Sequence, residues 1–376
     1  MILQDSSAKE SPLTKKYQFE EKTIRVVTID DSALIRLTLS RYLSQFSDIE
    51  VVGQGGNGRE MLALVESLLP DVVVLDVEMP VMNGLEALEQ LMHSHPLPVI
   101  MLSNLTGKGA EVTLQALELG AVDFVIKPQP SITMAETVAL LVQKIRQASQ
   151  AQVQYRPDGF AEDADHRAKM PAGLDSSQNV SKRVMPLQPM DTLLAIASST
   201  GGPSALTALL STIPPGLPLG GVIIQHMPMG FTAILGQRLN RISSYKIMEA
   251  VDGSRLMRGQ FLIAPGGYHL TFDKMGVAAL NEGPPVNGVR PAADVTFQSL
   301  AQTFGQQIIV VVLTGMGNDG FVGAREIHQF GGKVIAQDEK SAVIFGMPRQ
   351  IIESNLAEHV ATPEMLGVYL AGQVAA

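Results

Sequence analysis

The chain has 376 residues, of which 45% are hydrophobic and 17% charged, a composition typical of two or three folded domains and not of a disordered chain. Its net charge of −9 disfavours binding to a nucleic-acid backbone, so no nucleic-acid partner is expected. The absence of cysteine excludes thiol nucleophiles, disulfides and cysteine-ligated metals. The polar stretch up to Lys22 lacks a signal-peptide core, and no apolar run reaches about 18 residues, so we expect a cytoplasmic protein without membrane insertion.

From Ile24 to about Ala151, short apolar runs alternate with amphipathic stretches. Strands are predicted at Ile24–Ile29, Glu50–Gly53, Val72–Leu75, Val99–Leu102 and Val122–Ile126. Continuous apolar runs are typical of strands buried on both faces, so the pattern predicts a doubly wound, five-stranded parallel sheet of the flavodoxin-like kind. Ligands of such sheets bind at the carboxyl ends of the strands.

Polar side chains follow four of these strands. Asp30 and Asp31 follow the first strand, Asp76 the third, Ser103 the fourth and Lys127 the fifth. Clustered carboxylates favour a hard cation such as Mg²⁺, and one carboxylate could accept a phosphoryl group whose charge the cation and the lysine neutralise. The structural alternative, in which Asp31 caps the next helix, accounts for one residue but not for the set.

Residues 53–58, Gly-Gln-Gly-Gly-Asn-Gly, fit the pattern G-x-G-x-x-G between a strand and a helix. In dinucleotide-binding folds this turn belongs to the first strand–helix unit, which here holds the aspartate pair. We therefore expect an ordinary glycine-rich turn and no dinucleotide.

The segments VVTIDDSALIR, PDVVVLDVEMPVMNGLEAL, VIMLSNLT and GAVDFVIKP resemble the receiver domain of two-component response regulators. The resemblance runs from Ile24 to about Gln147 and implies a Mg²⁺ site of three carboxylates: Asp30, Asp31 and Asp76. It further implies that Asp76 accepts a phosphoryl group from a histidine kinase and that Lys127 contacts the phosphate. Ser103 and Phe124 would form the switch, and a cis peptide bond would join Lys127 to Pro128.

Between Val153 and Met190 the periodicity stops in a polar stretch with scattered proline and glycine, which is typical of a linker. A second alternating pattern follows. Its predicted strands are Thr192–Ala197, Val222–Gln225, Phe261–Ala264, Ile308–Leu313 and Lys333–Ala336, its helices Pro203–Leu210 and Ala292–Phe304, and its hairpin His269–Phe272 with Val277–Asn281. We therefore predict an extension (1–23), a first α/β domain (24–147), a linker (148–190) and a second α/β domain with a mainly parallel sheet (191–376).

Three strand ends of the second half carry a serine, a histidine and an aspartate. Ser199 lies in a Ser-Ser-Thr-Gly-Gly turn before a helix, where backbone N–H groups can stabilise an oxyanion. His226 ends the next strand, and Asp319 lies in the glycine-rich loop after Ile308–Leu313. Together they offer a nucleophile, a base and an orienting carboxylate, with Asp294 as the next carboxylate to consider. Without such partners, the serine turn would be an ordinary capping or anion-binding turn.

The segments AIASSTGGPSAL, VIIQHMPMGFT, LIAPGGYHL, PPVNGVRPAADVTF, VVLTGMGNDG and AQDEKSAVIFGMPR resemble the catalytic domain of the chemotaxis protein-glutamate methylesterase family. The resemblance implies a nucleophile at Ser199, a base at His226, an orienting residue at Asp319 and an oxyanion hole at the backbone of Thr200 and Met316. Ser198 stands where glycine or alanine is usual in the family, which leaves two neighbouring hydroxyls to distinguish.

By this resemblance, the expected function is a phosphorylation-activated serine hydrolase that demethylates glutamate γ-methyl esters on cytoplasmic chemoreceptor helices and deamidates receptor glutamines. No metal or other cofactor is expected at the esterase site. The alternative is a response regulator whose second half only binds a ligand or partner; such a protein would not need a functioning Asp319.

Overall fold

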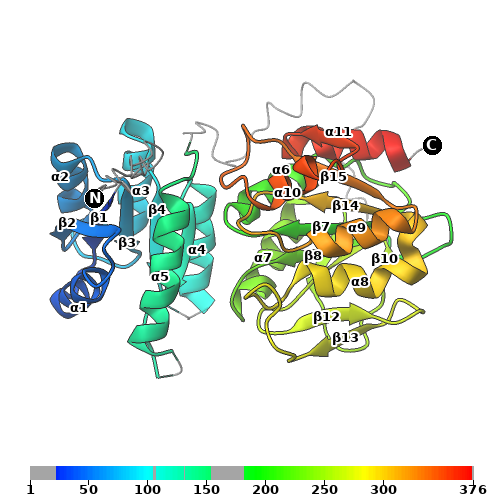
Figure 1. Cartoon of the computed structure of the whole chain (residues 1–376), viewed down its shortest axis with the longest axis horizontal. Coiled ribbons are helices and arrows are strands. Elements are labelled where there is room, and N and C mark those ends of the chain that lie inside the picture. The colour runs from blue at the N-terminus through cyan, green and yellow to red at the C-terminus, as the bar shows by residue number, and fades with distance from the viewer. Residues whose placement is uncertain (1–22, 105–106, 131, 154–181, 375–376) are drawn as a thin grey trace, which may run out of the picture.

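The computed structural model describes residues 23–104, 107–130, 132–153 and 182–374, and these form two α/β halves that lie side by side (Figure 1). The first half, which ends at Val153, contains one sheet with helices on both of its faces. The second half begins at Lys182 and contains a larger sheet.

The first half has five parallel strands in the order β2-β1-β3-β4-β5. Its strands are β1 (Ile24–Ile29), β2 (Ile49–Gly55), β3 (Val72–Asp76), β4 (Val99–Ser103) and β5 (Asp123–Ile126). Its helices are α1 (Ala33–Leu43), α2 (Gly58–Leu68), α3 (Gly84–Ser94), α4 (Gly107–Glu118) and α5 (Met134–Ala148). The predicted doubly wound parallel sheet is confirmed.

Local side chains fix where these helices begin. Asn83 of α3 and Thr133 of α5 form capping boxes with glutamates three residues later. The N-cap of α1 is Ser32, so the structural alternative that assigned this role to Asp31 is wrong and the Asp31 carboxylate is exposed.

The second half has a seven-stranded sheet in the order β16-β15-β14-β7-β8-β11-β9, in which every neighbouring pair is parallel. These strands are β7 (Thr192–Ser198), β8 (Leu219–Gln225), β9 (Lys246–Glu249), β11 (Gln260–Ile263), β14 (Ile308–Val312), β15 (Lys333–Gln337) and β16 (His359–Ala361). The helices are α6 (Gly202–Thr212), α7 (Phe231–Ile242), α8 (Ala293–Phe304), α9 (Phe321–Gln329), α10 (Met347–Glu353) and α11 (Pro363–Val374), with a 3₁₀ turn at Gly305–Gln307.

Two antiparallel pairs complete this half. The predicted hairpin is confirmed as β12 (His269–Phe272) with β13 (Ala278–Asn281), and β6 (Met185–Pro186) pairs with β10 (Met257–Arg258). Lys182 also binds Asn240 of α7. The chain therefore already contacts the second half at Lys182, before residue 190, the predicted end of the linker.

Three glycines turn the chain at the carboxyl edge of this sheet. Gly201, Gly230 and Gly320 precede α6, α7 and α9 with φ angles of 78°, 87° and 87°. Only glycine adopts this left-handed region without strain. Each short turn therefore keeps the residues that follow β7, β8 and β14 close to the sheet edge.

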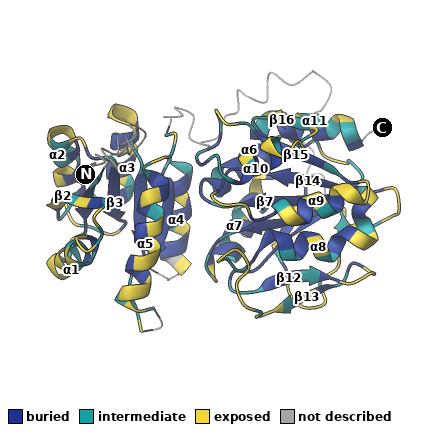
Figure 2. Ribbon diagram, viewed as in Figure 1, coloured by how far each residue is buried: buried dark blue, intermediate teal, exposed yellow. Residues whose placement is uncertain are grey.

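The central strands of both main sheets are buried, whereas the outer faces of the helices are exposed (Figure 2). Three clusters of buried apolar side chains form the core, and one of them runs through both halves. Among the residues that the structure describes, no helix has the length and apolar character needed to cross a membrane.

We expect Gly221→Ala in β8 to destabilise the second half by about 1–3 kcal/mol, because overpacking a core has that cost. An added Cβ would lie 2.4 Å from a ring carbon of Phe261 and 2.6 Å from the carbonyl oxygen of Leu194. Gly372→Ala in α11 is the control, since no atom lies within 4 Å and alanine favours helix by about 0.5–1 kcal/mol. Urea unfolding would measure both variants; an unchanged midpoint for Gly221→Ala would contradict this account of the packing.

Candidate functional site

Ser199 lies directly after β7, in the turn that leads into α6. Its N–H donates to the carbonyl of Thr314 over 3.0 Å, and its own carbonyl accepts from the N–H of Gly202 over 2.8 Å. These bonds fix the Ser199 backbone between two strand ends while its residue surface stays partly accessible.

The neighbouring hydroxyl is used differently. Ser198 is fully buried, and its Oγ donates to Oε1 of Gln225 over 2.7 Å. Nε2 of Gln225 in turn donates to the carbonyls of Ser199 and His226, over 2.9 and 3.1 Å. The hydroxyl of Ser198 therefore helps to hold the turn in place through Gln225. Ser199 is the serine of this pair that stays partly accessible.

His226 and Asp319 form a close pair at the same sheet edge. Nε2 of His226 lies 2.7 Å from Oδ2 of Asp319, whose side chain is only 3% exposed. The backbone N–H groups of Ala293 and Asp294, at the start of α8, also donate to this carboxylate. Burial alone would raise the pKa of Asp319, but the His226 pair and these donors hold the pKa below its ordinary value.

Nδ1 of His226 makes no hydrogen bond within the described residues, so this nitrogen is the one that could accept a proton. The hydroxyl of Ser199 makes no hydrogen bond to His226 within the described residues. Hydrogen bonds of this kind often tighten only when substrate is bound. The amides of Thr200 and Met316 donate to no acceptor in the part of the chain that the structure describes, so both are available to an oxyanion.

Two further side chains complete the pair's surroundings. Within the described residues Asp294 makes no hydrogen bond to His226; its carboxylate accepts from the N–H of Gly323 and from the side chain of Asn287, over 2.8 and 3.0 Å. Burial raises its pKa. Asn287 is not among the residues predicted for this site. The only sequence feature that points to it is its position inside the family-like segment PPVNGVRPAADVTF.

The second cluster lies at the carboxyl edge of the first sheet. One carboxylate oxygen from each of Asp30, Asp31 and Asp76 lies within 4.8 Å of the others. Nζ of Lys127 lies 2.8 Å from Oδ2 of both Asp30 and Asp76. The structure thus brings together all four residues predicted to share a site.

Burial and pairing act in opposite directions on the pKa values of this cluster. It raises the pKa of Asp76 to about 6, although the bond to Lys127 opposes the shift. Burial would lower the pKa of Lys127, but its pairing with Asp30 and Asp76 raises that pKa. The carboxylates therefore carry more charge than one lysine balances, which suits a divalent cation with oxygen ligands.

The predicted switch residues lie beside this cluster. Oγ of Ser103 is 2.5 Å from Oγ1 of Thr113, and the carbonyl of Ser103 accepts from the N–H of Lys127 over 2.8 Å. The expected cis bond between Lys127 and Pro128 is wrong, because the cis bond among the described residues joins Arg290 to Pro291. Lys127 reaches both carboxylates from a trans peptide.

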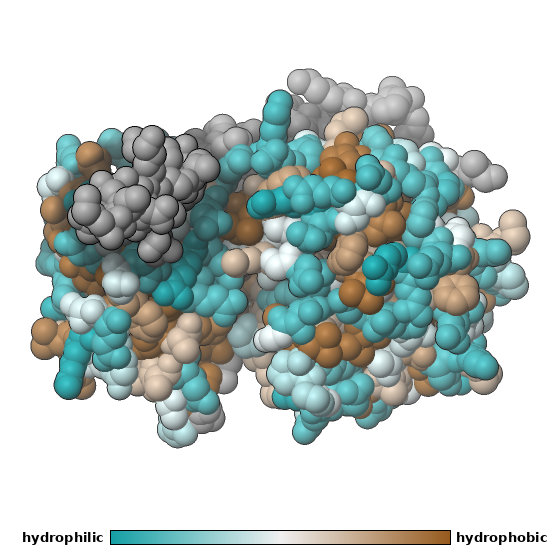
Figure 3. Space-filling view, viewed as in Figure 1, coloured by the Kyte–Doolittle hydropathy of each residue, from teal (hydrophilic) through white to brown (hydrophobic). Residues whose placement is uncertain are grey.

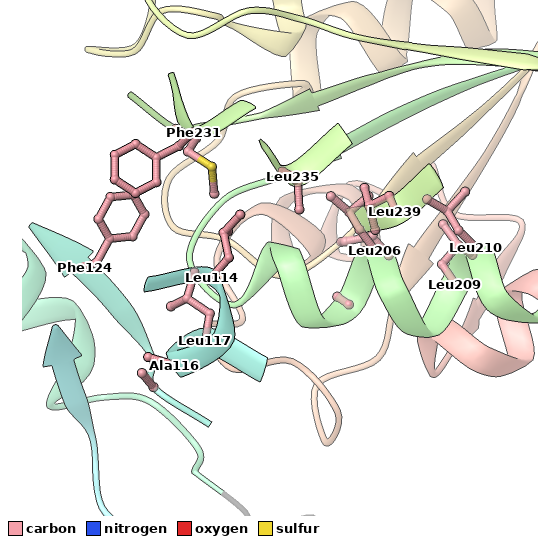
Figure 4. Close-up of a cluster of buried hydrophobic side chains, with 14 of the residues drawn as sticks. Leu114, Ala116, Leu117, Phe124, Leu206, Leu209, Leu210, Phe231, Leu235 and Leu239 are labelled. Carbon is pink, nitrogen blue, oxygen red and sulfur yellow. The ribbon is translucent and has the colours of Figure 1, made fainter. Parts of the chain in front are cut away.

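Phe124 packs against the second half. Its ring stacks on that of Phe231, at the start of α7, with centroids 4.4 Å apart. Leu114 and Leu117 of α4 belong to the same buried cluster as Leu235 of α7 (Figure 4). The first half therefore covers the helix that follows the His226 loop.

Polar contacts surround this apolar interface. Oγ1 of Thr200 donates to Oδ2 of Asp123 over 2.5 Å, and Lys144 binds the other oxygen of Asp123. Arg238 of α7 pairs with Glu118 of α4. The first half thus contacts Thr200, the residue next to Ser199.

The glycine-rich turn of residues 53–58 serves packing. A Cβ on Gly53 would lie 2.6 Å from Cδ1 of Leu68, and one on Gly58 would lie 2.6 Å from Cβ of Ala87. Asn57 caps α2 with its side chain. These glycines are explained by close neighbours within the fold, as expected for an ordinary turn.

Comparison with known proteins matches both halves to described families. Residues 26–139 match the response regulator receiver domain, and residues 194–370 match the CheB methylesterase family. The catalytic domain of the Thermotoga maritima CheB methylesterase is similar in structure, with a TM-score of 0.47 and 38% identity over 49% of this chain and 99% of that chain.

Two curated relatives match nearly the whole chain, and both are named protein-glutamate methylesterase/protein-glutamine glutaminase. The protein from Pectobacterium atrosepticum is 41% identical over 360 residues, covering 94% of this chain and 97% of its own. The protein from Salmonella typhimurium is 40% identical over 360 residues, covering 93% and 98%. The chain therefore belongs to the protein-glutamate methylesterase/protein-glutamine glutaminase family, with a receiver domain followed by a methylesterase domain.

Proposed function

We propose that this chain is a cytoplasmic, phosphorylation-activated hydrolase that demethylates glutamate γ-methyl esters on chemoreceptor helices and deamidates receptor glutamines. Its full-length relatives carry these activities in their names. The observation that carries the proposal is the buried His226–Asp319 pair beside Ser199 at one sheet edge. A domain that only bound a ligand would have no use for a base oriented by a buried carboxylate.

In the proposed mechanism, Oγ of Ser199 attacks the γ-carbonyl carbon of the ester while Nδ1 of His226 takes its proton. Asp319 holds the ring and stabilises the imidazolium that forms. The amides of Thr200 and Met316 would bind the oxyanion. The C–O bond to methoxide then breaks, and His226 passes the proton to the leaving group as methanol forms.

Water completes the reaction. His226 takes a proton from a water molecule that attacks the acyl-Ser199 carbonyl, and the glutamate carboxylate leaves as Ser199 regains its proton. A glutamine side chain reacts in the same way, with ammonia as the leaving group. No step requires a metal ion at this site.

Ser199→Ala should lower methanol release from methylated receptor membranes by about 10⁴-fold or more, because it removes the nucleophile. Ser198→Ala is the matched control: it removes the bond to Gln225 but leaves the accessible hydroxyl, so most activity should remain. Near-equal activity of Ser199→Ala and the unmodified protein would rule out this mechanism.

For the receiver domain, we propose that Asp30, Asp31 and Asp76 hold Mg²⁺ and that Asp76 accepts a phosphoryl group from a chemotaxis histidine kinase. When bound, Mg²⁺ would neutralise charge on the phosphoryl oxygens. An Asp76 oxygen forms the new bond to phosphorus as the donor's P–N bond breaks. Lys127, already within 2.8 Å of Asp76, would then bind the phosphoryl group.

Mg²⁺ affinity should fall as the pH drops below about 6, the pKa of Asp76, because protons then compete for that carboxylate. The dissociation constant should rise by about tenfold per pH unit, since one proton is displaced for each ion bound. Calorimetric titration between pH 4.5 and 7.5 would measure this. Asp76→Asn should bind more weakly and lose most of the dependence, and an equal slope in both proteins would refute the role of Asp76.

The docked receiver domain is proposed to inhibit the enzyme. It contacts Thr200 beside the nucleophile and Phe231 behind the His226 loop, which restricts access for a receptor helix. Phosphorylation of Asp76, acting through Ser103 and Phe124, would weaken this docking. The division into 1–23, 24–147, 148–190 and 191–376 stays part of the proposal; the pairing of β6 supports starting any truncation no later than Lys182.

A chain that begins at Lys182 should release methanol faster than the unphosphorylated full chain, by about 5- to 150-fold for a coupling of 1–3 kcal/mol. A small phosphodonor with Mg²⁺ should activate the full chain but not Asp76→Asn, which cannot accept the phosphoryl group. If the truncated chain were slower than the unphosphorylated full chain, the receiver would be assisting catalysis and the inhibitory role would be wrong.

A further inference from the structure

The loop between β13 and α8 reaches back to the candidate triad. Nη1 of Arg290 donates to the carbonyls of Glu282 and Gly283, over 2.7 and 2.8 Å, which ties the two ends of the loop together. Val286 and Val289 form a short bridge, and Asn287 lies between them with a φ angle of 54°. The loop therefore holds one asparagine in a left-handed conformation that few residues other than glycine adopt.

Asn287 joins two buried carboxylates, although the residue itself is exposed. Its Nδ2 donates to Oδ2 of Asp294 over 3.0 Å and to Oδ1 of Asp319 over 3.2 Å. Those two side chains belong to residues that are only 4% and 3% exposed. A primary amide supplies two N–H donors, so one neutral group can satisfy both acids.

The remaining partners of Asp319 are of other kinds. Within the described residues, its carboxylate binds His226 and two backbone amides of α8 besides Asn287. The backbone amides are fixed by the helix, and His226 is the group to be positioned. Oδ1 accepts from the backbone N–H of Asp294 over 3.1 Å and from Nδ2 of Asn287 over 3.2 Å. Within the described residues, Asn287 is thus the side chain that, besides His226, holds the carboxylate facing the imidazole.

We propose that Asn287 is a positioning residue, whose amide holds Asp319 in the orientation that directs Nδ1 of His226 toward Ser199. The proposal rests on the proposed function. It does not require Asn287 to touch substrate. Its loss should therefore lower kcat more than it raises KM, since the reacting groups are misaligned while substrate contacts persist.

The test uses Asn287→Gly in the full chain, activated by a small phosphodonor with Mg²⁺. Glycine keeps the φ of 54° without strain and removes only the side chain. We expect kcat for methanol release to fall by about 10- to 100-fold, the range found when a residue that hydrogen-bonds to and orients a metal ligand is lost. KM should change by less than about twofold.

Asn355→Gly is the matched control, because Asn355 also has a φ of 54° and is exposed, away from the candidate triad in sequence and sheet position. It should keep the activity of the unmodified protein. Asn287→Gly with unchanged kcat would overturn the positioning role. Ser199→Ala, measured alongside, separates the two hypotheses: full activity there would refute the proposed function itself.

Asn287→Asp provides a readout that a merely structural role would not move, and it carries the test if the glycine variant fails to fold. The titratable groups that face this side chain within the described residues are Asp294, Asp319 and, through Asp319, His226. An added carboxylate there stabilises the protonated imidazole. The acid limb of the kcat/KM profile should move to higher pH, and kcat should fall because an ionised carboxylate cannot donate to Oδ1 of Asp319. An unchanged kcat would overturn the proposal.

Discussion

Parallel strand pairing determines where both functional sites lie. Every strand of the two main sheets runs in the same direction as its neighbours, so the carboxyl ends of distant segments meet at one edge of each sheet. In the methylesterase domain, left-handed glycines then turn the chain within a few residues. The candidate site residues therefore lie near the sheet edge, because only a short turn separates each strand from the helix that follows it.

The two sites treat buried charge in opposite ways. Asp319 receives hydrogen bonds on both oxygens, which stabilise its ionised form despite burial. Asp76 has Lys127 and a long contact to the N–H of Glu78, and its ionised form is disfavoured. The first carboxylate is thus complete without a ligand. The ionised form of the second would be better stabilised if further positive charge were bound beside it.

Much of this organisation could be predicted from the sequence, because apolar runs and the polar residues after them are local signals. The strands that carry the candidate residues were placed to within a few residues. The edge strands β9 and β16 were not predicted, since the first has alternating exposure and the second has three residues. The face of the molecule shown in Figure 3 carries polar and apolar side chains interspersed. Contacts such as that between Thr200 and Asp123 join residues far apart in sequence, so no local periodicity of the sequence predicts them. Asn287 could not be predicted from the sequence, because its proposed role depends on its bonds to Asp294 and Asp319 in the folded chain.

The interface between the receiver and methylesterase domains joins two parts of one chain, with residues 154–181 between them. Docking is consequently a unimolecular event, and its equilibrium does not depend on how many copies of the protein a cell holds. Joining two partners in one chain can raise the effective concentration of each at the other to the order of millimolar. Even an interface too weak to hold two separate proteins together at micromolar levels would stay docked within one chain, and a modest change in its free energy would then be enough to separate the two parts.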